Sequence, residues 1–139
     1  MAVLAGEGLA CWRGAGLVFA ELSFAIESAG ALVIVGANGA GKSSLLRLMA
    51  GLSRPIAGRL SWDGADVFDD RDAYCRRLHY VGHHDALKPT LSVGETLAFW
   101  ASFRGGRAGL AGRVTAALAA IGLDRLAELP VRYLSQGQR

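Results

Sequence analysis

The chain has 139 residues, of which 52% are hydrophobic and 19% charged, and its formal net charge is +3. This balance excludes an intrinsically disordered chain and leaves enough apolar residues for a core. The longest wholly apolar runs are far shorter than the ~20 residues that a membrane-spanning helix requires. Because the basic residues form no block, we expect no nucleic-acid partner.

The first residues, MAVLAGEGLAC, resemble an export signal only superficially. They carry no positive charge before the apolar run, and Glu7 interrupts that run, so we expect no secretory signal peptide. Cys11 and Cys75 do not have the spacing of a metal or redox site. We expect both to be buried, reduced thiols in a cytosolic protein.

The first half of the sequence predicts strands with one crossover helix. Residues 18–26 alternate between apolar and other side chains, which predicts a half-buried strand. Residues 31–35, ALVIV, form a continuous apolar run, typical of a strand covered on both faces in a parallel sheet. Leucines and a methionine at helical density predict a helix over residues 45–49, with Gly51 as its stop.

Further along, residues 58–67 predict a strand followed by a tight hairpin turn at Asp63-Gly64. Residues 76–82, RRLHYVG, predict another strand. The chain then becomes helical. We therefore expect a β-rich core over residues 1–91 and a helical subdomain over residues 92–139.

Two helices are predicted in the helical part. Ser92 and Glu95 have the spacing of a capping box, in which each side chain accepts a hydrogen bond from the other's backbone N–H. The helix that they open is broken by Gly105-Gly106. Apolar residues at helical spacing predict a second amphipathic helix over residues 110–121, ended by Gly122.

The segment GANGAGKS, Gly36 to Ser43, fits the pattern G-x-x-x-x-G-K-[ST] completely. It lies between a predicted strand and a predicted helix, the context in which this pattern forms a phosphate loop. The alternative is a glycine-rich turn with an incidental lysine, which leaves the complete pattern unexplained. The residues expected to bind a nucleotide here are Gly36, Ala37, Asn38, Gly39, Ala40, Gly41, Lys42, Ser43 and Ser44.

The order of residues in this loop matches the chemistry of a triphosphate. Glycines let consecutive backbone N–H groups face one anion, and the start of a helix adds partial positive charge. Lys42 would contact the β- and γ-phosphates, and the Ser43 hydroxyl would complete the coordination of Mg²⁺. We therefore expect ATP and Mg²⁺ as cofactors, with Lys42 and Ser43 as catalytic residues.

The segment Leu134–Gln138, LSQGQ, resembles the L-S-G-G-Q signature of ATP-binding cassette (ABC) proteins, with Gln136 in place of the first glycine. It follows the phosphate loop by about a hundred residues, with a helical insert between them, as in that family. A polar turn before a helix is the plainer alternative. The resemblance implies an α/β fold of the P-loop NTPase class with an ABC-type nucleotide-binding domain.

The resemblance also implies roles for the signature. Ser135, Gly137 and Gln138 match the family positions that face the γ-phosphate held by the opposite protomer. A second nucleotide-binding domain is therefore an expected partner. Membrane-spanning transporter subunits are the other, and they imply a peripheral location on the cytoplasmic face of the bacterial inner membrane.

Two longer stretches, residues 36–64 and 78–100, are similar to the CcmA-type ATP-binding subunits of the haem exporter of bacterial cytochrome c maturation. This implies an ABC-type transport ATPase that couples ATP hydrolysis to haem export. A motor for another bacterial transporter, a nucleotide-binding module without turnover and an ABC protein acting on ribosomes are the alternatives.

Two positions depart from the family pattern. His84 stands where the family usually has a glutamine that approaches Mg²⁺ and the membrane subunit, so the resemblance implies a metal and catalytic role for His84. The aromatic residue that stacks on adenine would fall near Arg13, one residue after Trp12. Trp12 is a candidate adenine platform or a packing residue, and Arg13 could stack instead.

Members of the family continue with an apolar strand that ends in Asp-Glu, and then with a switch histidine. The 139 residues contain no such elements after the signature. We therefore interpret the chain as an N-terminal fragment that binds ATP at best and is inactive alone.

Overall fold

The structure is a computed structural model that describes residues 3–14, 16–82 and 86–139. The chain forms two compact units, Met1–Tyr80 and Val81–Arg139. The second unit begins before the boundary expected at residues 91 and 92, because the preceding segment pairs with its C-terminal part. The N–H of Val131 donates to the carbonyl of Leu91 at 2.9 Å, and that of Arg132 to Pro89 at 3.2 Å.

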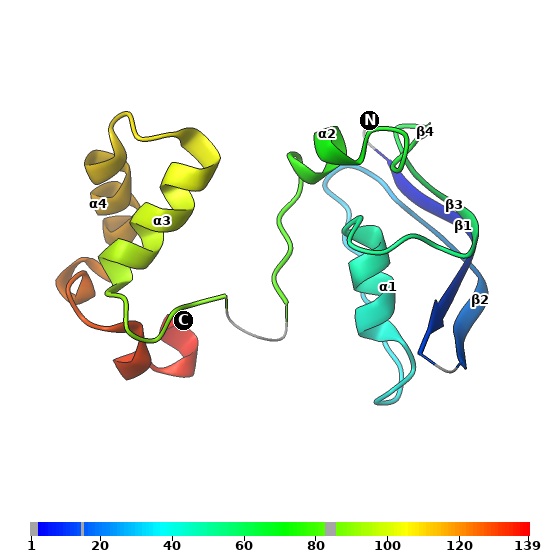
Figure 1. The fold of residues 1–139 in the computed structure, drawn as a ribbon, viewed down its shortest axis with the longest axis horizontal. Helices are drawn as coiled ribbons and strands as arrows, with labels where there is room; N and C mark the ends of the chain where they lie inside the picture. The colour runs from blue at the N-terminus through cyan, green and yellow to red at the C-terminus, as the bar shows by residue number, and fades with distance from the viewer. Residues whose placement is uncertain (1–2, 15, 83–85) are drawn as a thin grey trace. The chain divides into compact units, whose positions relative to one another are not determined.

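The first unit contains one antiparallel sheet (Figure 1). Its strands are β1 (Leu4–Arg13), β2 (Gly16–Ile26), β3 (Ala57–Trp62) and β4 (Ala65–Asp66), in the order β2-β1-β3-β4. The strand predicted over residues 18–26 is present as part of β2. We did not predict β1, although it lies at the centre of the sheet between β2 and β3.

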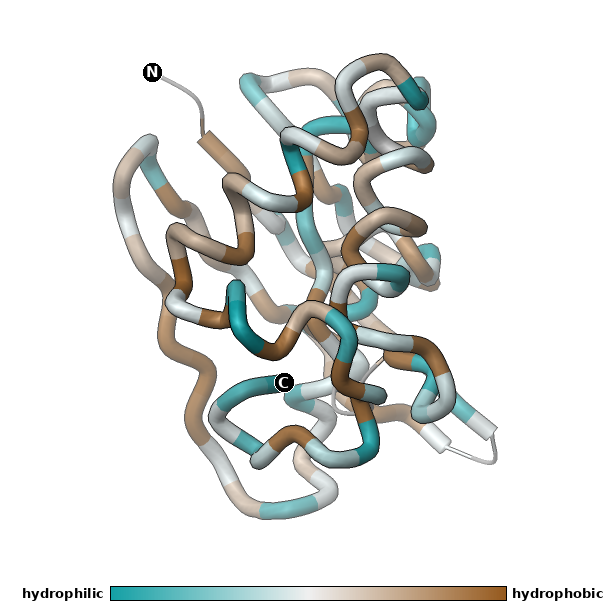
Figure 2. Tube along the Cα trace, turned by 90° about the vertical axis from the view of Figure 1, so that its left-hand side faces the viewer, coloured by the Kyte–Doolittle hydropathy of each residue, from teal (hydrophilic) through white to brown (hydrophobic). Residues whose placement is uncertain are grey.

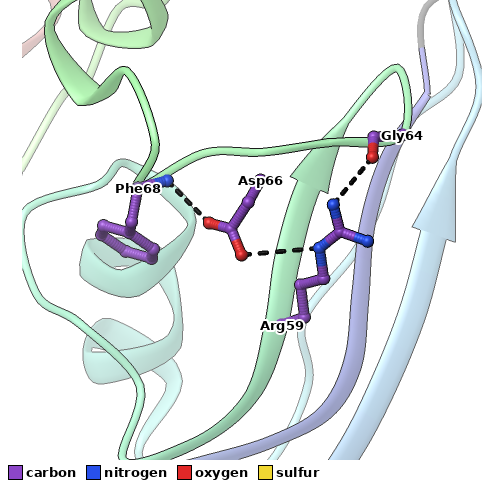
Figure 3. Close-up of polar contacts among 4 residues, drawn as sticks. All are labelled: Arg59, Gly64, Asp66 and Phe68. Atoms are coloured by element: carbon purple, nitrogen blue, oxygen red, sulfur yellow. Dashed lines mark hydrogen bonds and ion pairs between the residues drawn. The ribbon is translucent and has the colours of Figure 1, made fainter.

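The hairpin predicted over residues 58–67 is also present. Asp63 and Gly64 both have positive φ, 50° and 79°, as a two-residue type I′ turn requires. Arg59 joins the two sides of the turn by donating to the Gly64 carbonyl at 2.9 Å and pairing with Asp66 at 3.4 Å (Figure 3). Asp66 also accepts from the N–H of Phe68 at 2.8 Å, which fixes the exit from β4.

The core of the first unit lies between the sheet and α1 (Lys42–Met49), with α2 (Arg71–Cys75) at its edge. Leu9, Leu48 and Leu60 are fully buried there. Tyr74 of α2 donates its hydroxyl to the Met49 carbonyl at 2.5 Å and so holds the last turn of α1. Both cysteines are free; Cys11 is buried as expected, whereas Cys75 is partly exposed.

Two strand predictions were wrong. Residues 31–35 and 76–82 form no strand, and Figure 1 draws no arrow for either segment. Val33, Val35 and Val81 are exposed, to 79%, 83% and 92%, whereas Ile34 and Leu78 are partly buried against the core of the first unit. Figure 2 colours the trace by hydropathy, with hydrophobic residues in brown. The physical reason is pairing: a strand needs a hydrogen-bonded neighbour, and in the described residues the sheet of four strands does not extend to either segment.

The second unit is helical, as predicted, with α3 (Val93–Gly105), α4 (Leu110–Ala120) and three short 3₁₀ helices, Asp124–Leu126, Val131–Tyr133 and Gln136–Gln138. The predicted capping box opens α3: the N–H of Glu95 donates to Ser92 Oγ at 3.1 Å, and the N–H of Ser92 donates to Glu95 Oε2 at 2.8 Å. As predicted, α3 ends at Gly105-Gly106 and α4 ends just before Gly122. The core contains Val93, Leu118, Val131 and Leu134.

Candidate nucleotide-binding site

The phosphate loop, Gly36–Ser43, leads directly into α1, whose first residue is Lys42. Gly39 and Gly41 have φ of 86° and 92°, a backbone conformation that other residues rarely adopt. A Cβ on Gly41 would also overlap the side chain of Val18 on β2. Gly41 thus allows the loop to turn while it rests against the sheet.

Lys42 is held across this loop. Its ammonium group donates to the carbonyls of Gly36 and Ala37, each at 2.7 Å, and the side chain is half-buried. These contacts place a full positive charge beside the loop, where the charge would meet an anion.

The N-terminus of α1 adds backbone donors to this charge. The first hydrogen bond of the helix runs from the N–H of Leu45 to the Gly41 carbonyl at 2.9 Å. The N–H groups of Lys42, Ser43 and Ser44 precede that bond, so they lack an intrahelical acceptor. Ser43 is exposed and Ser44 is buried. Loop and helix together present donors and a cation to one side, which is the arrangement that binds phosphate.

A pocket of about 420 Å³ lies against the loop. The structure brings six of the expected residues to its wall, whereas Gly36, Ala37 and Ala40 belong to the loop without lining the pocket. We did not predict the part that Val18 plays here; its place in an alternating strand showed that it faces inward, but not what it touches. The lining residues are Arg13, Val18, Asn38, Gly39, Gly41, Lys42, Ser43 and Ser44.

Trp12 and Arg13 differ in the pockets that they line. Arg13 lines both the loop pocket and a neighbouring pocket of about 140 Å³, whereas Trp12 lines only the neighbouring one. Trp12 is 55% exposed, and its Nε1–H donates to the Gly14 carbonyl at 3.1 Å. Of the two residues considered for adenine stacking, Arg13 is the one that lines the loop pocket.

The remaining expected site residues are separate from the loop. Ser135, Gly137 and Gln138 lie in the second unit and are exposed. The N–H of Ser135 donates to the Gln138 side chain at 2.9 Å, at the start of a three-residue 3₁₀ helix. His84 lies outside the described residues.

The family model of ABC transporters matches residues 19–139. The cytochrome c biogenesis ATP-binding export protein CcmA of Paramagnetospirillum magneticum is 52% identical over 134 residues, covering 96% of this chain and 62% of the relative. Its counterpart in Rhodospirillum rubrum is also 52% identical, covering 99% and 58%. The chain thus spans about three fifths of the length of these curated relatives.

Solved structures support the same fold. An ATP-binding subunit of an ABC transporter superposes with a TM-score of 0.71 at 25% identity, covering 97% of this chain and 57% of that one. The cbiO1 protein of Clostridium perfringens, part of the ABC transporter complex cbiONQ, has a TM-score of 0.80 at 25% identity, covering 97% and 56%. The predicted ABC-type nucleotide-binding fold and the predicted likeness to CcmA-type subunits are both confirmed. The chain belongs to the ABC transporter family.

Proposed function

We propose that this chain is the ATP-binding part of an ABC exporter subunit, which in its full-length form couples ATP hydrolysis to haem export in cytochrome c maturation. The phosphate loop supports the first half of this proposal, because Lys42 lies across the loop at the start of α1, where cation and backbone donors would bind an anion. The likeness to CcmA supports the second half.

In this proposal the loop residues bind the triphosphate and orient it. Lys42 supplies a full charge to the β- and γ-phosphates, and the N–H groups of Ser43 and Ser44 donate to the phosphate oxygens. The exposed hydroxyl of Ser43 fits a ligand for Mg²⁺, which would neutralise phosphate charge. We assign His84 to the same metal as a proposal from the family resemblance alone.

The proposed partner surface for membrane subunits is on α3. Phe99 and Phe103 are exposed to 56% and 79%, more than is usual for aromatic side chains that only pack within a unit. Phe99 lines a pocket of about 330 Å³ together with Thr96, a buried residue whose hydroxyl has no hydrogen-bond partner among the described residues. Within the described ranges, no helix is long and apolar enough to cross a membrane.

A second protomer is the other proposed partner. We assign the signature residues Ser135, Gly137 and Gln138 to the nucleotide held by the second protomer, so they would bind in trans. Their exposure in the second unit supports such a role.

Calorimetric titration of the 139-residue chain with Mg-ATP tests the proposal. Lys42→Ala removes a charge-assisted phosphate contact. We expect it to weaken the binding free energy by about 1.5–3 kcal/mol, which is at least a tenfold loss of affinity. Arg107→Ala, which removes an exposed positive charge from the second unit, is the matched control and should bind as the parent does. Equal affinity of folded Lys42→Ala and parent would refute the proposal.

A further inference from the structure

Three arginines from separate parts of the first unit line the small pocket next to the loop pocket. Arg13 is the last residue of β1, Arg47 lies in the last turn of α1, and Arg54 follows that helix. The pocket has a volume of about 140 Å³, and none of its described lining residues is an aspartate or a glutamate. The formal net charge of the whole chain is also +3, so the charges of the remaining residues sum to zero.

The backbone that carries Arg54 is held on both sides. The N–H of Leu52 donates to a carbonyl in the last turn of α1 at 2.8 Å, and the N–H of Ile56 donates to the carbonyl of Ala10 on β1 at 2.9 Å. The guanidinium of Arg54 lies over the ring of Phe68, with its Cζ 5.0 Å from the ring centroid. Because its neighbours already hold Arg54 at the pocket, less freedom is lost when a ligand binds there.

Two serines add hydroxyl groups to the lining of this pocket. Ser53 is half-buried, and Ser44 is only 8% exposed. Among the described residues no hydrogen bond engages the Ser44 hydroxyl. Guanidinium and hydroxyl groups both donate to phosphate oxygens, and a guanidinium can do so with two parallel bonds. Three like charges around one small space repel each other, and a bound anion offsets that repulsion.

We propose that this pocket is a second anion site, which binds a phosphate group independently of Lys42. The inference goes beyond the proposed function, because Arg47 and Arg54 line this pocket and do not line the loop pocket. The small volume favours a single phosphate group over an acidic protein segment. Free phosphate and a phosphate carried on the ribose of a bound nucleotide share this chemistry.

Amide NMR titration of the 139-residue chain with inorganic phosphate tests the inference. We expect two groups of shifts, one in residues 36–44 and one in residues 47–54. Arg47→Ala and Arg54→Ala should each weaken the second group by about tenfold, because each removes a charge-assisted contact with the phosphate, and leave the first within about twofold.

Lys42→Ala should have the opposite effect, with a loss of about tenfold confined to residues 36–44. Arg76→Ala is the matched control, because it removes an exposed arginine of the same unit that does not line the pocket. It should bind phosphate as the parent does.

The same titration in saturating Mg-ATP identifies the source of the phosphate group. Shifts in residues 47–54 that persist on adding phosphate indicate a free anion. If ATP blocks them, ATP that carries an added 3′-phosphate should bind about tenfold more tightly than ATP, and Arg54→Ala should remove that gain.

Several results would overturn the inference. Phosphate shifts confined to residues 36–44 would show that no second site exists. Equal losses in Arg54→Ala and Arg76→Ala would show that only the net charge matters. Shifts in residues 47–54 with a glutamate-rich peptide but not with phosphate would assign the pocket to an acidic protein segment. Blocking by ATP with no gain from the 3′-phosphate would assign the space to the nucleotide itself.

The folding of the variants and the proposed function are tested separately. Arg47 and Arg54 are exposed, so their replacement leaves the core intact, and circular dichroism checks this. If the proposed function fails, residues 36–44 do not respond to phosphate, while residues 47–54 still do.

Discussion

The phosphate loop, Gly36–Ser43, and the signature segment, Leu134–Gln138, were both predicted to bind an anion at the start of a helix. The loop opens the eight-residue helix α1, rests against Val18 and lines a pocket. The signature segment opens a three-residue 3₁₀ helix, and the N–H of Ser135 is bonded to the side chain of Gln138. The phosphate loop is exposed over residues 36–40 but contacts the sheet at Gly41, whereas the signature segment is buried only at Leu134 and exposed over residues 135–138. The comparison indicates that a binding motif takes up its site geometry where neighbouring elements hold its backbone, as β2 does at Gly41.

The largest effect that we expect from this difference concerns turnover. The purified 139-residue chain should bind Mg-ATP without steady phosphate release, because phosphoryl transfer to water depends on positioned groups beyond the loop. Within these residues, no carboxylate downstream of the phosphate loop belongs to an Asp-Glu pair that follows an apolar strand. Phosphate release with and without Lys42→Ala is the measurement. Steady, Lys42-dependent turnover would mean that the water-positioning group lies elsewhere in these residues.

The support that β2 gives to the loop can be broken at Gly41. Gly41→Ala should lower the unfolding free energy by about 3 kcal/mol, because left-handed strain adds to the overlap with Val18. Gly39 has a similar φ of 86°, but a Cβ there would meet open space. Gly39→Ala should therefore lower the unfolding free energy by only about 1–2 kcal/mol. Denaturant titration of both variants separates overlap from strain. Equal losses would argue against support from β2.

Local patterns predicted much of this fold, and the failures share a cause. The alternation in β2, the Asp63-Gly64 turn and the Ser92 capping box depend on residues close in sequence, so the sequence was sufficient. Residues 31–35 and 76–82 would each need a neighbouring strand distant in sequence, and in the described residues neither segment pairs with the sheet. In β1, register shifts between Gly6 and Trp12 interrupt the alternation that marks a strand.

The candidate site shows the same difference between features set by local sequence and features set by distant residues. The loop pattern predicted the turn and the lysine, and the structure adds Arg13 and Val18 to the pocket wall. Their contribution depends on how the β1–β2 hairpin packs on Gly41, which no local pattern encodes. The binding roles assigned to residues 36–44 stay predictions, as do the roles of Trp12, Ser135, Gly137, Gln138 and His84.

A smaller effect is expected at the far end of α1, which Tyr74 anchors. Burial, with Cys75 beside it, raises the pKa of Tyr74 to about 12 from 10.0. A raised tyrosine pKa means that the stabilisation is complete below the unfolded pKa and is lost as pH rises towards the folded value. The parent should therefore lose up to about 2 kcal/mol between about pH 9 and pH 12 that Tyr74→Phe does not lose.

Tyr74→Phe also removes the hydrogen bond to the Met49 carbonyl, which should cost about 1 kcal/mol near neutral pH. Unfolding titrations of parent and Tyr74→Phe at several pH values give both quantities. Parallel pH profiles for the two proteins would show that this hydroxyl does not anchor α1.

The smallest effect should come from the signature segment. Ser135→Ala and Gly137→Ala should each leave the affinity of the chain for Mg-ATP within about twofold of the parent, because we assign these residues to a partner's nucleotide. Calorimetric titration under the conditions used for Lys42→Ala provides the comparison. A tenfold loss in either variant would show that the segment binds this chain's own nucleotide.

The most direct measurement of the central claim is an amide NMR titration of the 139-residue chain with Mg-ATP. The account predicts shifts concentrated in residues 36–44 and at Arg13, while the amides of residues 134–138 stay unchanged. Shifts of equal size in the signature segment, or none in the loop, would contradict the claim that the phosphate loop alone is a formed nucleotide site in this chain.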